Sequence, residues 1–139
     1  MIPYILDTDT LTLLQEAHPL VCQRVRACQP TDLAITVISI EEQFLGWITA
    51  LRQAKKHDEL ARVYQRLADN VQILAGLRII AYTIPAMLRY EQLKAAKLNV
   101  RKMDLRIAAI TLEITGTLVT RNVRDFQRIP GLTIENWAA

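Results

Sequence analysis

Residues 102–126 constrain the fold of this chain more than any other stretch. Residues 103–115 are apolar on nearly every side, which predicts a central helix covered by its neighbours on most faces. Gly116 is able to close that helix in the left-handed conformation. Residues 117–120 have the β-branched density of a buried strand, and a polar turn follows. A helix that leads directly into a buried strand indicates an α/β protein.

The rest of the chain repeats this alternation. Short apolar or β-branched runs predict strands over residues 2–6, 33–38, 77–82 and 132–136. The segments between them predict helices over residues 8–17, 19–27, 39–55, 58–76 and 85–98. Strands that alternate with helices pair in parallel through right-handed crossovers. We therefore expect an α/β fold, a three-layer α/β/α sandwich with a mainly parallel central sheet, in a single domain over residues 1–139.

Composition excludes several classes of protein. With 139 residues and 51% apolar content, the chain is long enough to bury a core. A formal charge of +3 permits a polyanionic partner without requiring one. Cys22 and Cys28 suit reduced thiols better than a disulfide framework or a zinc site. No uncharged run of membrane-spanning length and no basic leader is present, so we expect a cytoplasmic protein with no membrane association.

Carboxylates follow the predicted strands. Asp7 ends the first strand, Glu42 lies in the helix after the second, and Asp125 lies in the turn after the fourth, while Asp104 begins the preceding helix. Parallel strands bring their carboxyl ends to one edge of the sheet. Ionised carboxylates that crowd together need a counter-charge. A set of oxygen ligands suits Mg²⁺ or Mn²⁺, and such a site supports phosphodiester hydrolysis, so a nuclease is the first hypothesis.

The same residues have structural interpretations. Glu42 lies three residues after Ser39, the spacing of a capping box, and its neighbour Glu41 is expected to face solvent. Asp104 could be an N-cap. Asp125 could form surface ion pairs with the arginines that flank it. Asn122 could be a turn residue with a left-handed backbone.

Basic residues flank the two later acids. Arg101 and Lys102 precede Asp104, and Arg124 precedes Asp125. Cations beside an acidic site are what a groove that follows a phosphate backbone requires. We predict that Arg101, Lys102 and Arg124 contact RNA.

The order of these motifs resembles that of the PIN-domain ribonucleases, and especially the VapC-type toxins of bacterial toxin–antitoxin pairs. The resemblance rests on ILDTD at residues 5–9, the Ser39–Glu42 segment with Gly46, DLRIAA at 104–109, and LVTRNVRDFQRIPGLTIENW at 118–137. Many members have a glycine shortly before the third acid. Here residues 100–103 read VRKM instead, so the shape of that loop differs.

The resemblance implies a PIN sandwich and an Mg²⁺- or Mn²⁺-dependent endoribonuclease. It implies RNA as substrate, with tRNA as one candidate, and a small antitoxin as inhibitor. It also implies a homodimer, for which residues 58–76 and 85–98 offer apolar helix faces. It assigns the metal and catalytic roles to Asp7, Glu42, Asp104 and Asp125. Asp9, Thr120 and Asn122 are the supporting residues.

Two other classes of function remain at this point. The first is a PIN-like module without catalysis that binds RNA or protein. The second is a phosphatase of the haloacid-dehalogenase type, which Asp7 and Asp9 suggest; Leu11 and the missing later pair of acids disfavour it. A cleft that gathers the carboxylates would support the nuclease. Glu42 and Asp104 on different sides of the sheet would contradict it.

Overall fold

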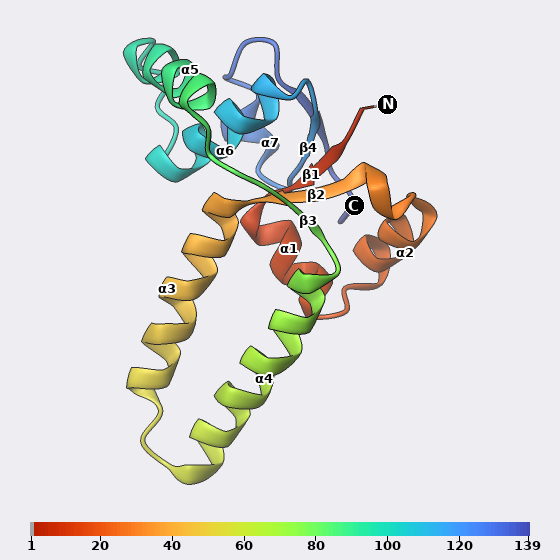
Figure 1. Ribbon diagram of the computed structural model, residues 1–139, viewed down its shortest axis with the longest axis vertical. Coiled ribbons are helices and arrows are strands. Elements are labelled where there is room, and N and C mark those ends of the chain that lie inside the picture. The colour runs from red at the N-terminus through yellow and green to blue at the C-terminus, as the bar shows by residue number, and fades with distance from the viewer. Residues whose placement is uncertain (1) are drawn as a thin grey trace.

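A computed structural model describes residues 2–139 of the chain. Within these residues one parallel sheet has the strand order β3-β2-β1-β4-β5 (Figure 1). Ile5 of β1 pairs with Ala34 of β2 on one side and with Leu118 of β4 on the other. The strands are β1 (Tyr4–Leu6), β2 (Leu33–Thr36), β3 (Arg78–Ile80), β4 (Thr117–Val119) and β5 (Thr133–Glu135).

Helices cover both faces of this sheet, and the residue alternation of β1 shows how. Ile5 faces the core beneath α5 and α6, and Leu6 faces the core on the side of α1, α2 and α4. The three-layer α/β/α sandwich expected from the sequence is therefore confirmed. The helices are α1 (Thr8–Gln15), α2 (Pro19–Ala27), α3 (Val37–Gln53), α4 (His57–Ala75), α5 (Ile84–Ala95), α6 (Lys102–Glu113) and α7 (Val123–Phe126), with a 3₁₀ turn at Pro30–Asp32.

The predicted central helix is α6. Ile107, Ala108, Ala109 and Ile110 are all buried, because α5 and the sheet cover α6 on opposite sides. The interpretation of Gly116 is wrong. Thr115 is the residue with positive φ, at 54°. Gly116 is needed for a close approach instead, since a Cβ there would collide with the Ile5 side chain and lie 3.1 Å from the Pro3 carbonyl oxygen.

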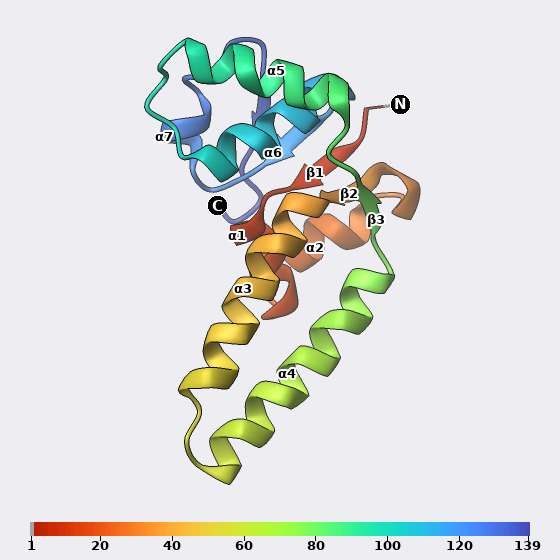
Figure 2. The same cartoon turned by 60° about the vertical axis from the view of Figure 1, so that its left-hand side comes forward.

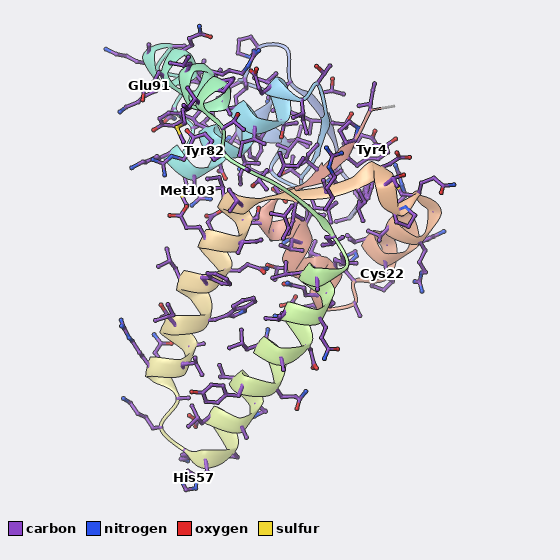
Figure 3. All side chains as sticks on the ribbon, viewed as in Figure 1. Tyr4, Cys22, His57, Tyr82, Glu91 and Met103 are labelled. Carbon is purple, nitrogen blue, oxygen red and sulfur yellow. The ribbon has the colours of Figure 1, made fainter. Side chains whose placement is uncertain are left out.

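Helices α3 and α4 form a long hairpin that projects away from the sheet (Figures 1 and 2). His57 marks its far tip, and Met103 of α6 lies near the start of α3 (Figure 3). Both ribbon views place α1 beside the hairpin at its sheet end. The sheet end of α3 therefore lies near α1 and α6, the helices that follow Asp7 and carry Asp104.

The element boundaries differ from the predictions mainly at strand ends. The strand predicted over 33–38 ends at Thr36, because α3 begins at Val37. The turn predicted around Asp125 is the short helix α7. In the part of the chain that the structure describes, no helix is both long enough and apolar enough to cross a membrane.

Candidate functional site

Asp7 is fixed by the junction of β1 with α1. Its carboxylate caps α1 by accepting a hydrogen bond of 2.8 Å from the Thr10 amide, and only 5% of the residue is exposed. Burial raises the pKa of Asp7, and hydrogen bonds from Thr120 and Thr10 partly oppose that rise. Asp7 therefore caps α1, while its burial disfavours the ionised form of its carboxyl group.

Asp104 lies in the first turn of α6 and is not its N-cap, which is Arg101. The Arg101 guanidinium binds Asp104 through both oxygens: Nε to Oδ2 at 3.2 Å and Nη2 to Oδ1 at 3.0 Å. The Asp104 side chain is 10% exposed. Burial raises its pKa, Arg101 lowers it, and the charges of Glu42 and Asp125 raise it further. The alternative of a simple N-cap is thus wrong for Asp104.

Glu42 does not form the capping box that its spacing from Ser39 suggested. Thr36 caps α3, because its hydroxyl accepts a 3.3 Å hydrogen bond from the Ser39 amide. The Glu42 carboxylate instead accepts one hydrogen bond from the Thr8 hydroxyl at 2.6 Å and one from Arg101 at 3.3 Å. The Thr8 hydroxyl also lies 3.0 Å from the Ser39 hydroxyl. Glu42 therefore faces the same cluster as Asp104.

Arg101 is the centre of this cluster. One nitrogen, Nη2, contacts both Asp104 at 3.0 Å and Glu42 at 3.3 Å, so a single cation joins carboxylates from α6 and α3. Hydrogen bonds to Asp104 raise the pKa of Arg101. The sequence predicted Arg101 as an RNA contact, and the structure places it among the acids. A pocket of about 350 Å³ adjoins it, lined by Asp7, Thr8, Asp9, Arg101, Asp104, Arg121, Asn122 and Phe126.

Asp125 lies at the start of α7, beside this pocket. Asn122 caps α7, and its side-chain amide donates to Asp125 Oδ2 at 3.0 Å, while Arg128 donates to Oδ1 at 3.2 Å. The φ of Asn122 is −84°, so the left-handed interpretation is wrong. The buried Thr120 hydroxyl accepts from the Asn122 amide at 2.9 Å. Asp125 is therefore held by its own turn, and only its charge reaches Asp104.

The remaining predicted residues lie at the surface of the cluster. Asp9 forms a two-contact ion pair with Arg121 at 2.7 and 2.8 Å, and about half of each side chain is exposed. Lys102, Arg124 and Glu41 are exposed. Sequence reasoning missed Thr8 and Ser39 as partners of this site; the signal available for Thr8 was its position between two acids directly after a strand.

The carboxylate cluster suits a hard cation in its chemistry. Among residues 2–139, no three histidine, cysteine or carboxylate side chains are grouped closely enough to hold a metal ion as they stand. Asp104 and Glu42 nevertheless already share one cation, the Arg101 guanidinium. Carboxylate oxygens, completed by water or phosphate oxygens, are the ligands that Mg²⁺ and Mn²⁺ prefer. The chemistry of these carboxylates therefore fits a divalent cation.

Comparison with known proteins adds to this geometry. No family model matches the chain. It is similar to Ribonuclease VapC1 of Haemophilus influenzae (strain R2866), with 27% identity over 140 residues that cover 96% of this chain and 97% of that protein. A chain in the crystal structure of DNA-bound VapBC from Salmonella typhimurium matches with a TM-score of 0.82 and 25% identity, covering 99% of both chains. Over nearly its whole length this chain is therefore similar to VapC ribonucleases. A chain of VapBC2 from Rickettsia felis, bound to a DNA fragment from its promoter, matches with a TM-score of 0.78 and 27% identity over 99% of both chains.

This similarity to VapC proteins confirms the resemblance drawn from the motifs. The similarity extends over nearly the whole chain, as did the motifs at residues 5–9, 39–46, 104–109 and 118–137. It also removes the phosphatase alternative, which rested on Asp7 and Asp9 alone. The cluster at the carboxyl edge of the sheet is thus the candidate functional site of this chain.

Proposed function

We propose that this chain is a divalent-metal-dependent endoribonuclease and the toxin of a toxin–antitoxin pair. The observation that carries the proposal is the convergence of Asp104 and Glu42, from different helices, on one cation beside the buried Asp7. Its relatives named Ribonuclease VapC support the RNA-cleaving part of the proposal. The metal dependence and the residue roles are inferred from the chemistry of the acids.

Asp7, Glu42 and Asp104 are the residues that would hold Mg²⁺ or Mn²⁺, and Asp125 would support them from α7. When bound, the cation would supply charge that polarises the phosphate and makes water a better nucleophile. The chain's own residues prepare this arrangement. The Thr8 hydroxyl orients Glu42 through its 2.6 Å hydrogen bond, and the Thr10 amide fixes Asp7. These contacts reduce the motion of the acids before any cation arrives.

A cation held by Asp104 and Glu42 would have to displace Arg101 from them. The Arg101 side chain is 63% exposed, so it is able to turn into solvent or toward a phosphate. Released in this way, Arg101 would join the exposed Lys102 and Arg124 as a phosphate contact. Binding that depends on such cations weakens steeply as the salt concentration rises.

The remaining proposals concern assembly. Solved relatives such as VapBC from S. typhimurium are complexes, and we propose that this chain also binds a small antitoxin. We further propose a homodimer, because α5 exposes Ile84, Met87 and Leu88. A single domain acting on RNA in the cytoplasm completes the proposal; tRNA is one candidate substrate.

Cleavage of total RNA with and without Mg²⁺ tests the central proposal, with new 5′ ends mapped by sequencing. Glu42→Gln removes a charge from the cluster, and Glu41→Gln removes the same charge from the exposed neighbouring position. We expect cleavage that requires Mg²⁺, is lost in Glu42→Gln and persists in Glu41→Gln. Cleavage that survives both a chelator and Glu42→Gln would contradict the proposal.

A catalytically silent module is the second candidate, and the Arg101 bridge is the observation that favours it. A permanent guanidinium between Asp104 and Glu42 would leave no place for a metal. RNA binding without cleavage, together with no Mn²⁺ binding by calorimetry, would identify this case.

A further inference from the structure

A second pocket lies next to the carboxylate cluster. It has a volume of about 500 Å³ and is formed by α1, α3 and α4. Thr8 lines both pockets, and Glu42 contributes to the wall of the second one. A substrate whose phosphate lies at Asp104 and Glu42 therefore has this pocket immediately beside it. The volume lies within the usual range for small-ligand sites.

The wall of this pocket carries a pair of side-chain amides. Gln15 Nε2 donates to Gln43 Oε1 at 3.0 Å, and Gln43 Nε2 donates to Gln15 Oε1 at 2.7 Å. Gln43 is 8% exposed and also lies 3.4 Å from the Thr12 hydroxyl. Each amide presents a donor and an acceptor, which is the pattern that the edge of a nucleobase offers. The two glutamines are thus able to exchange their mutual hydrogen bonds for those of a base.

Trp47 supplies an aromatic wall to the same pocket. Its ring is half-buried and contacts Phe44 at a centroid distance of 5.6 Å and an angle of 44°. Aromatic side chains that line a groove are the usual stacking platform for bases of single-stranded RNA.

Gly46 has no packing role that explains it. It lies inside α3, where glycine weakens a helix relative to alanine. A Cβ on Gly46 would meet nothing within 4 Å, so no neighbouring group requires its small size. Gly46 lines this pocket and its continuation of about 180 Å³ along the hairpin. The glycine keeps open a space that the protein itself does not fill.

The charges of the pocket select against a phosphate. Glu16, Glu42 and Asp69 line it, and Arg66 is the cation among its lining residues. Arg66 is 3.9 Å from Glu16 and offsets part of that charge. The balance remains negative, so a phosphate group is repelled while an uncharged ring with polar edges is accepted.

We propose that this pocket binds an unpaired nucleobase of the RNA, next to the phosphodiester that the carboxylate cluster would cleave. The inference rests on the proposed ribonuclease function and extends it to substrate recognition. The base stacks against Trp47, and its edge bonds the amides of Gln15 and Gln43. RNA cleavage by this chain consequently requires a single-stranded nucleotide beside the cleavage site.

Gly46→Leu tests the proposal, because it fills the pocket with a side chain that favours helix. Thr49→Leu is the matched control: it adds the same side chain to the same helix at an exposed position outside the pocket. Both are placed in an Asp7→Asn background to limit cleavage, and binding of a labelled 12-nucleotide single-stranded RNA is measured. We expect Gly46→Leu to weaken binding about tenfold, in the range found for loss of one stacked base, and Thr49→Leu to change it less than twofold.

An abasic series separates base recognition from contacts with the backbone. Removing one base at a time from the RNA should weaken binding strongly at one position in the Thr49→Leu protein. The same removal should have no further effect in the Gly46→Leu protein, because the pocket is already closed. Equal losses in both proteins would overturn the proposal.

Trp47 offers a readout that does not depend on cleavage. The chain has two tryptophans, and Trp137 is 2% exposed, so a fluorescence change on adding free nucleosides reports Trp47. We expect nucleosides to alter the fluorescence, and Gly46→Leu to abolish the change. If nucleosides bind while total RNA stays intact, the ribonuclease proposal fails and the base pocket stands. If Gly46→Leu spares both RNA binding and nucleoside binding, the pocket does not bind a base and the proposal is overturned.

Discussion

Arg101→Gln tests whether the chain carries its own competitor for the metal ion. The arginine binds Asp104 at 3.0 and 3.2 Å and Glu42 at 3.3 Å. Glutamine retains a polar side chain and removes the charge. If a divalent cation uses the same two carboxylates, it has to displace Arg101 in the native protein and nothing in the variant. The variant should therefore bind the cation more tightly.

The contacts of Arg101 set the size of this effect. Its side chain is 63% exposed, and exposed ion pairs contribute about 0–1 kcal/mol. The Asp104 side chain is 10% exposed, and hydrogen bonds to charged groups contribute roughly 1.5–3 kcal/mol. Because solvent reaches the arginine end of the pair, we expect a net competition of about 1 kcal/mol. That value corresponds to roughly a fivefold lower Kd for the cation.

Titration calorimetry of Mn²⁺ into the RNA-free protein measures this affinity directly. Arg121→Gln is the matched control, because Arg121 lines the same pocket but pairs with Asp9. Both substitutions remove one positive charge near the site, so a general electrostatic effect changes both proteins alike. A Kd that is unchanged in Arg101→Gln, or lowered equally in the control, would refute the competition.

Three other substitutions test how Asp7, Gly46 and Gly116 affect the stability of the fold. Asp7→Asn keeps the cap on α1 and removes a carboxylate whose pKa is raised by burial. A carboxylate with a raised pKa in the folded state stabilises the fold below its unfolded pKa of about 3.9, and this contribution is lost as the pH rises through the folded pKa. The variant should therefore lose RNA cleavage and melt higher than the native protein at pH 7, with the gain vanishing below about pH 4; an unchanged Tm at pH 7 would contradict this. Gly46→Ala should raise the free energy of unfolding by about 0.5–1 kcal/mol in urea, because its Cβ meets open space; a loss of stability would reveal a contact that the structure lacks. Gly116→Ala should lower it by roughly 1–3 kcal/mol, because its Cβ collides with Ile5, and a neutral result would show that Ile5 moves freely.

The sheet and its two layers were predictable because local patterns and the long-range fold agree. Every predicted strand exists, and buried α6 carries the apolar run that predicted a central helix. The boundary between β2 and α3 was not predictable in this way. Both Thr36 and Ser39 are able to cap a helix, and the β-branched Val37 and Ile38 favour strand. Ile38 belongs to α3 because its side chain packs in the core beneath α5 and α6. That packing joins distant parts of the chain, so the local sequence does not reveal it.

The positions of the acids were predictable, and their partners were not. Parallel strands have to deliver Asp7 and the residues after β2 and β4 to one edge, so the convergence follows from topology. The Arg101 bridge requires the start of α6 to meet the first turns of α3, a contact between residues 59 positions apart in sequence. No local pattern encodes that distance. The same is true of Thr8, whose hydroxyl reaches Glu42 across 34 positions.

Three departures from local stability rules lie together in this chain. Burial raises the pKa values of Asp7 and Asp104, so the folded protein opposes the ionised state of both at neutral pH. Gly46 weakens the interior of α3 without a packing reason. All three residues border two adjoining pockets that share Thr8. Departures that serve packing would be distributed through the core, whereas departures concentrated around one groove indicate selection for binding or chemistry. A metal-dependent site with an adjacent base pocket is therefore supported by where the fold gives up stability as well as by which residues are present.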